Sequence, residues 1–180
     1  MSYAWILIAV VTLFLVVLIG AYVVYFIAFA RDDKRLAGEE EIPNTEYYTP
    51  YEERVVENIR RLKTIACEEV QIESYDGLKL FGRYYHYEDN APIVIFFHGY
   101  RSNSIRDGSA MYMLGERKGI NVLLVEQRSH SKSEGKTITF GIRERHDCES
   151  WVRYVVERFG KETKIVLWGV SMGAATVLMA

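Results

Sequence analysis

A short apolar segment that runs into a glycine-bracketed serine constrains this chain most. Residues 164–168 have the length and β-branched content of a buried strand, and Gly169, Val170, Ser171, Met172 and Gly173 follow at once. A serine on so tight a strand-to-helix turn needs neighbours without side chains, because only glycine tolerates both the close approach and the unusual dihedral angles. The pattern therefore predicts an α/β unit in which the Ser171 hydroxyl projects from the carboxyl end of a strand.

This turn favours nucleophilic chemistry. The backbone N–H of Met172 lies at a predicted helix N-terminus, where developing negative charge is stabilised. We take Ser171 as the candidate nucleophile, Met172 as a candidate oxyanion donor, and Gly169 and Gly173 as the residues that permit the turn. The alternative is an ordinary strand-turn-helix junction of some other α/β protein.

Strands and helices alternate before this turn. Thr49-Pro50-Tyr51-Glu52 has the form of a capping box, with proline at the first helical position. Buried strands that alternate with helices predict a parallel sheet with right-handed crossovers. The expected elements are helices at 50–63, 104–118 and 142–159, a hairpin of strands 68–74 and 78–86 turning at Asp76-Gly77, and buried strands at 92–97, 122–125 and 164–168.

A second motif, His98-Gly99-Tyr100, follows the predicted strand at 92–97. A glycine there lets the backbone turn beside the sheet, so that an N–H after it, assigned to Tyr100, can face the same point as the Met172 N–H. His98 precedes the strand exit that this loop must form. We therefore expect it to hold the loop by hydrogen bonds rather than to act as the catalytic base. A plain strand-to-loop exit is the alternative.

Other polar residues predict structural roles. The loop from Glu126 to Gly135 is expected to be a turn that Arg128 fixes by pairing with a carboxylate. Cys67 and Cys148 lack metal-ligand spacing and are expected to be free thiols. No metal or cofactor is expected. The net charge of −2, with no basic cluster after residue 35, argues against nucleic-acid binding.

The N-terminus carries a membrane signal. Residues 2–30 contain no charged side chain. This uncharged run is longer than the roughly 20 helical residues that a bilayer core requires. A cleaved signal peptide is the rival interpretation, since residues 28–30 (Ala-Phe-Ala) resemble a cleavage site, but its apolar region should be shorter. The cations Arg31, Lys34 and Arg35 favour a single-pass anchor at the cell membrane with a cytoplasmic domain. The expected organisation is an anchor at 1–30, a linker at 31–48, an amphipathic helix at 49–65 and an α/β domain at 66–180.

Over residues 66–180 the chain resembles the α/β-hydrolase superfamily, and more narrowly the bacterial membrane-anchored serine aminopeptidase and monoacylglycerol-lipase-like branch. Three motifs carry the resemblance: Phe97-His98-Gly99-Tyr100, the segment 126–133, and Gly169 to Gly173. In that branch the middle motif is usually Asp-x-Arg-Gly-x-Gly-x-Ser, whereas this chain has Glu126, Ser129 and Ser131 at the acidic and glycine positions. The resemblance implies a catalytic Asp and His beyond residue 180, so the chain is expected to be the front part of an α/β-hydrolase fold that stops after the nucleophile turn.

Two functional interpretations follow. The first is a membrane-anchored serine hydrolase that cleaves carboxylic or lipid acyl esters through an acyl-enzyme, with these 180 residues inactive by themselves. The second is a membrane-tethered, non-catalytic binding or scaffold protein on the same fold. Within the enzyme class, a peptide or thioester bond is also open.

Overall fold

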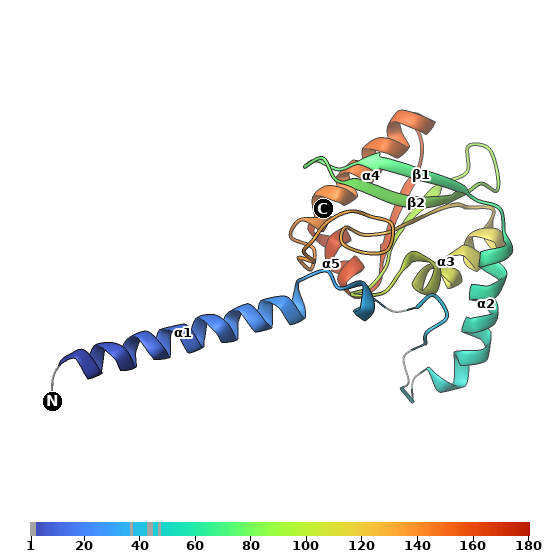
Figure 1. Ribbon diagram of the computed structural model, residues 1–180. Coiled ribbons are helices and arrows are strands. Elements are labelled where there is room, and N and C mark those ends of the chain that lie inside the picture. The colour runs from blue at the N-terminus through green and yellow to red at the C-terminus, as the bar shows by residue number, and fades with distance from the viewer. Residues whose placement is uncertain (1–2, 37, 43–44, 47) are drawn as a thin grey trace.

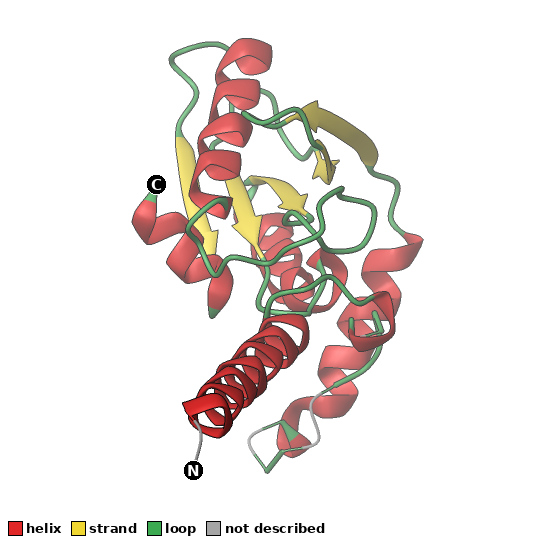
Figure 2. Ribbon diagram, turned by 60° about the vertical axis from the view of Figure 1, so that its left-hand side comes forward, coloured by secondary structure: helices red, strands yellow, loops and turns green. Residues whose placement is uncertain are grey.

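A five-stranded sheet between two layers of helices forms the body of the protein (Figures 1 and 2). The computed structural model describes residues 3–36, 38–42, 45–46 and 48–180. Ser2, where the uncharged run begins, and Pro43 in the expected linker lie outside the described residues. The strands are β1 (Glu68–Glu73), β2 (Lys79–Tyr85), β3 (Ile93–Phe97), β4 (Asn121–Val125) and β5 (Ile165–Gly169). The α-helices are α1 (Tyr3–Ala28), α2 (Glu52–Thr64), α3 (Ser104–Lys118), α4 (Glu144–Phe159) and α5 (Met172–Met179), with short 3-10 turns at Asp33–Arg35 and Thr49–Tyr51.

The sheet order is β1-β2-β4-β3-β5, so β3 is flanked by parallel partners on both sides. The predicted hairpin joins β1 and β2, and its Gly77 has the positive φ of 82° that glycine favours. The register places Phe97 of β3 opposite both Val125 and Gly169. The loops after β3, β4 and β5 therefore leave one edge of the sheet together.

The earlier helices cover one face of the sheet and the later helices cover the other. Helices α2 and α3 pack on one face through residues such as Ile59, Leu62 and Met111. Helices α4 and α5 pack on the other, where Trp151 and Val155 are buried. Cys148 lies in that second core, and both cysteines are free as expected.

The apolar run at 164–168 predicts a strand of the buried type, with an edge that we expect to be unpaired within these 180 residues, and the structure has that unpaired edge. β5 lies at the edge of the sheet, and the side chains of Val166 and Trp168 are 44% and 48% exposed. An apolar run predicts a strand, but it does not indicate whether other strands pair with it on one side or on both. The sequence pattern therefore identifies the element, and the exposure of these two side chains accompanies its unpaired edge.

The start of α2 also differs from expectation. Thr49 does not cap the helix: its hydroxyl donates to the carbonyl oxygen of Thr45, and Thr49–Tyr51 forms a 3-10 turn ahead of α2. The helix begins at Glu52 without a side-chain cap. A motif of four residues favours a capping box only if the first residue has extended backbone, which this chain does not adopt here.

Helix α1 extends away from the body of the protein (Figure 1). By length and composition it could cross a membrane, and none of its residues is buried against the rest of the chain. The chain after it does not leave as a free linker: Ala30 forms a β-bridge with Thr137, and the N–H of Arg31 donates to the oxygen of Lys136 at 2.9 Å.

Candidate active site

Ser171 sits in a strained turn between β5 and α5. Its φ of 52° and ψ of −115° place a non-glycine residue in a sparsely populated region of backbone space. The residue is exposed, and α5 begins with the next residue, Met172. The strand, tight turn and helix predicted from the sequence are thus all present.

Both glycines of the turn are sterically required. A Cβ on Gly169 would overlap the backbone of Gly173 and lie 2.5 Å from the nitrogen of Ala174. A Cβ on Gly173 would overlap the carbonyl of Phe97 and lie 2.8 Å from the oxygen of His98. The first turn of α5 therefore packs directly on the backbone where β3 ends.

The backbone N–H of Tyr100, in the loop after β3, is not used by its neighbours. The N–H of Gly99 donates to Asp107 Oδ2 at 2.8 Å, that of Arg101 to His130 Nε2 at 3.0 Å, and that of Ser102 to the oxygen of Gly99 at 3.2 Å. Among the described residues, the N–H of Tyr100 has no acceptor. This leaves Tyr100 as the available donor of the loop.

The unused donors belong to segments that lie next to the serine. A Cβ added to Gly99 would lie 3.6 Å from the Cβ of Ser171, so the backbone just before Tyr100 runs beside the turn. Met172 is the first residue of α5, and its N–H has no acceptor in the part of the chain that the structure describes. Two free N–H groups near an exposed serine hydroxyl could stabilise the negative charge that develops on the carbonyl oxygen of a substrate that this hydroxyl attacks.

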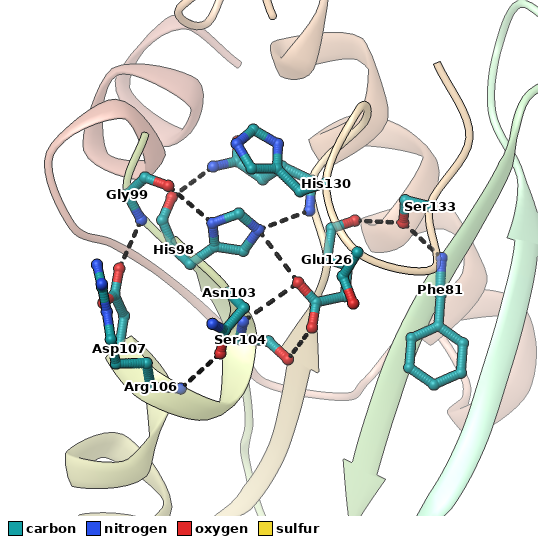
Figure 3. Close-up of polar contacts among 12 residues, drawn as sticks. Phe81, His98, Gly99, Asn103, Ser104, Arg106, Asp107, Glu126, His130 and Ser133 are labelled. Carbon is teal, nitrogen blue, oxygen red and sulfur yellow. Dashed lines mark hydrogen bonds and ion pairs between the residues drawn. The ribbon is translucent and has the colours of Figure 1, made fainter. Parts of the chain in front are cut away.

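His98 is fully buried and both of its ring nitrogens are engaged (Figure 3). Nε2 accepts the N–H of Gln127 at 3.0 Å, which assigns the ring proton to Nδ1, 2.8 Å from the oxygen of Gly99. The ring therefore ties the loop after β3 to the loop after β4. These hydrogen bonds are of the kind expected from the sequence.

His130 makes the reciprocal connection, which the sequence analysis missed. It lies in the loop after β4, accepts the N–H of Arg101 at Nε2, and directs Nδ1 to the oxygen of Arg128 at 2.9 Å. Burial lowers the pKa of His130 to about 3, so the ring is neutral at physiological pH. The two rings meet edge to face at 4.8 Å. The sequence offered no spacing signal for this connection, because His98 directly follows β3 whereas His130 lies inside the loop after β4.

Gln127 connects these loops to the serine helix. Its side-chain Nε2 donates to the oxygen of His98 at 2.5 Å, and its Oε1 accepts from the buried hydroxyl of Thr176 in α5 at 2.7 Å. One side chain thus bridges the exit of β3 and the second turn of α5. Sequence reasoning assigned no role to Gln127 or Thr176.

Glu126 anchors the start of α3 (Figure 3). Its carboxylate accepts from the hydroxyl and the N–H of Ser104, contacts Arg83 at 3.1 Å, and lies 3.4 Å from His98 Nε2. Burial opposes ionisation, yet the hydrogen bonds from Ser104 and the charge of Arg83 keep the pKa of Glu126 below its usual range. Glu126, which stands where the related motif usually has the shorter Asp, therefore has partners for both of its carboxylate oxygens.

Arg128 fixes the loop after β4, as expected from the sequence. Its guanidinium pairs with Asp147 at 2.6 and 2.7 Å and with Asp76 at 3.0 Å through two nitrogens. Burial disfavours its charge, but the two carboxylates keep the pKa of Arg128 above its usual value. Ser129 and Ser131, with φ of 65° and 46°, adopt the left-handed backbone at the two positions where the related motif has glycine.

No histidine or carboxylate of the described residues is hydrogen-bonded to the Ser171 hydroxyl. The ring nitrogens of His98 and His130 are already engaged, as described above. No group of three or more His, Cys, Asp or Glu that could hold a metal ion occurs in the described ranges.

Comparison with known proteins decides the family. The family model described as serine aminopeptidase, S33, matches residues 88–180, which is more than half of the chain. The chain belongs to this family of α/β-hydrolases. The matched segment begins before β3 and includes the loop after β3, the loop after β4 and the turn around Ser171.

Individual relatives agree with this family. The thiohydrolase aneE of Aspergillus aculeatus is 31% identical over 117 residues, covering 62% of this chain and 36% of that protein. The uncharacterized protein YqkD of Bacillus subtilis is 30% identical over 108 residues, or 60% and 35% of the two chains. The Pyrococcus furiosus esterase Pf2001 superposes with a TM-score of 0.59 at 28% identity, covering 66% of this chain and 48% of its own. The chain thus spans about a third of the length of these curated relatives.

Proposed function

We propose that this chain supplies the nucleophile and the oxyanion donors of a membrane-anchored serine hydrolase that cleaves carboxylic esters. The observation that carries the proposal is the strained, exposed Ser171, flanked by segments in which the backbone N–H groups of Tyr100 and Met172 have no acceptor among the described residues. The Ser171 oxygen attacks the ester carbonyl, and the two N–H groups stabilise the resulting oxyanion. Collapse of this intermediate releases the alcohol and leaves an acyl-enzyme, which water hydrolyses to the acid.

We further propose that the general base and the acid that orients it lie beyond residue 180. The resemblance to the α/β-hydrolases implies an Asp and a His there, in that order along the chain. The described histidines support a base elsewhere in the protein, because both ring nitrogens of His98 and of His130 are hydrogen-bonded to backbone groups. His98, Gly99, Gly169 and Gly173 act in support, by shaping the loop and the turn.

A thioester is the second candidate substrate bond. The observation in its favour is the 31% identity with a protein named thiohydrolase. The attack and the acyl-enzyme are the same for an ester and a thioester, and only the leaving group differs. A peptide bond, which the family description suggests, additionally requires protonation of an amine leaving group by the base.

The test is covalent labelling of the whole protein. A fluorophosphonate probe should modify Ser171, and Ser171→Ala should abolish both labelling and turnover of esters. The substitution Ser131→Ala serves as the control and should label normally, because Ser131 is an exposed serine in another loop. Unlabelled Ser171, or full turnover by Ser171→Ala, would leave the non-catalytic scaffold as the better interpretation.

The anchor has a separate test. Helix α1 should keep the protein in the membrane pellet through high-salt and carbonate washes, with release only by detergent. A soluble mature chain that starts near Arg31 would instead identify the segment as a cleaved signal. We propose a cytoplasmic domain on the basis of Arg31, Lys34 and Arg35, so external protease should leave it intact.

A further inference from the structure

The last turn of α1 is bound to the loop that carries the free Tyr100 N–H. The hydroxyl of Tyr100 donates to the carbonyl oxygen of Ala28 at 2.8 Å, and the guanidinium of Arg101 donates to the oxygen of Ile27 at 2.5 Å. The final carbonyls of a helix lack intrahelical partners, so the loop after β3 caps the C-terminus of α1. Arg101 also stacks on the Tyr100 ring, 4.9 Å from its centroid.

The chain that leaves α1 is then tied to the loop after β4. Ala30 and Thr137 form an antiparallel bridge, flanked by hydrogen bonds from Arg31 to Lys136 and from Ile138 to Phe29. The Arg31 guanidinium adds bonds to the carbonyl oxygens of Ser133 at 2.7 Å and Ser131 at 2.9 Å. Tyr25, one turn earlier, contacts the Thr137 hydroxyl at 3.0 Å.

Aromatic packing joins the two attachments. The Phe140 ring stacks on Tyr100 at 4.9 Å and meets Phe29 edge to face at 5.6 Å. Ala30 is only 8% exposed. The segment Tyr25–Arg31, which we call the strap, is therefore built into the same rim as the candidate oxyanion loop.

Because the strap is bonded to the loops of the candidate site, no flexible linker separates the end of the apolar helix from that site. Helix α1 has 26 residues, or about 39 Å at 1.5 Å per residue, and is apolar up to its last turn. A bilayer core is about 30 Å thick, so a spanning α1 brings its end to the membrane surface. Tyr100 is hydrogen-bonded to that end of the helix. The preceding residue, Gly99, lies beside the serine turn, since a Cβ added to it would be 3.6 Å from the Cβ of Ser171.

We propose that the strap positions the Tyr100 oxyanion donor and holds Ser171 at the bilayer surface, so that the substrates are amphiphilic esters whose acyl chains lie in the same membrane. This inference rests on the proposed hydrolase function for its substrate. It assigns Tyr25, Ala28, Ala30 and Arg31 to the active-site rim as positioning residues rather than to a passive tether.

The attachment is tested without catalysis by a cysteine pair. Ala30 and Thr137 form a non-hydrogen-bonded antiparallel pair, whose Cα atoms are about 4.5 Å apart and within the range that a disulfide spans. Ala30→Cys with Thr137→Cys, in native membranes under mild oxidation, should cross-link nearly completely. The control is Ala30→Cys with Glu157→Cys, because Glu157 is exposed on α4; it should stay reduced. Equal cross-linking of both pairs would show a loose tether and overturn the proposal.

Positioning is tested by Tyr100→Phe in the whole protein. This variant keeps the backbone N–H and the ring that stacks on Phe140, and loses only the hydrogen bond to Ala28. Its kcat for a soluble short-chain ester should fall about fivefold with KM unchanged, because an oxyanion donor acts on the transition state. Tyr154→Phe, which loses a contact with Arg158 on the exposed side of α4, should keep wild-type kcat. An unchanged kcat in Tyr100→Phe would remove the strap from the mechanism.

The substrate class is tested with vesicles. A diacyl lipid ester that does not exchange between bilayers should be hydrolysed when it shares a vesicle with the protein, and not when it is in separate vesicles. Equal rates in both arrangements would overturn the membrane-held substrate. If the cross-link forms but Ser171→Ala changes no activity, the hydrolase proposal fails while the strap's attachment stands.

Discussion

Two buried histidines hold the candidate site together through backbone groups. His98 accepts an N–H from the loop after β4, and His130 accepts an N–H from the loop after β3, so each loop fixes the other. The sequence predicted the holding role of His98, since it stands at a strand exit next to Gly99. It could not predict the role of His130, because the partner N–H lies 29 residues earlier and only the parallel register of β3 and β4 brings the two loops together.

The first prediction concerns His130 and acid stability. Its folded-state pKa of about 3 lies below the ordinary 6.5, so the unfolded chain binds a proton more readily. The free energy of unfolding should therefore fall as the pH drops from about 6.5 toward 3, by up to about 1.4 kcal/mol per pH unit. His130→Gln keeps an acceptor near the Arg101 N–H but has no titratable ring. Denaturation in detergent at pH 7, 6 and 5 should give a shallower decline for this variant, and parallel curves would contradict the assignment.

The second prediction concerns the left-handed serines. Ser131 has φ of 46° and an exposed side chain, and its hydroxyl makes no hydrogen bond among the described residues. Ser131→Gly removes the strain of a side chain in this region and should raise the free energy of unfolding by about 0.5–1 kcal/mol. Ser129→Gly is the matched comparison: it relieves similar strain but loses the hydrogen bond to the oxygen of Thr137, so its gain should be smaller. A loss of stability in Ser131→Gly would show that its backbone is not strained.

At the scale of elements, short periodic signals were enough to locate most helices and strands. The helix predicted at 104–118 coincides with α3, and the hairpin turns at Asp76-Gly77 as expected. These predictions succeeded because each rests on a local cause, such as the left-handed Gly119 that ends α3. The uncapped start of α2 was missed because Thr49 bonds to Thr45 in a 3-10 turn, which a four-residue motif does not reveal. The exposed side chains of β5 follow from its unpaired edge rather than from its own apolar run.

The third prediction tests the contact between α5 and β3. Gly173→Ala places a Cβ against the carbonyls of Phe97 and His98, which are backbone atoms and cannot rotate away. The helix must shift from the sheet, and the free energy of unfolding should fall by about 2–3 kcal/mol. Gly38→Ala is the control, because its nearest atoms would be side-chain atoms of Glu41 at 3.6 and 3.7 Å. Chemical denaturation that finds equal stability in both variants would mean that α5 does not pack as closely as described.

At the scale of the whole molecule, the sequence divided the chain at residue 30, whereas the structure connects the parts across that boundary. The uncharged run predicted a helix that could span a membrane, and α1 is such a helix. Its contacts with Tyr100 and Thr137 could not be read from the pattern, since each involves residues more than 70 positions away. The expected linker therefore begins as part of the rim of the candidate active site.

The last prediction concerns residues 1–180 by themselves. Ser171 lacks a hydrogen-bonded base among the described residues, and a serine that keeps its proton is a poor nucleophile at neutral pH. His98 and His130 cannot substitute for this base without releasing the backbone groups of the candidate oxyanion loop that they now bind. Purified in detergent, this chain should show no saturable turnover of a short-chain nitrophenyl ester, and it should be indistinguishable from its Ser171→Ala variant. Saturable turnover that Ser171→Ala abolishes would require one of these histidines to reach Ser171, and a second substitution, His98→Asn or His130→Gln, would then identify which.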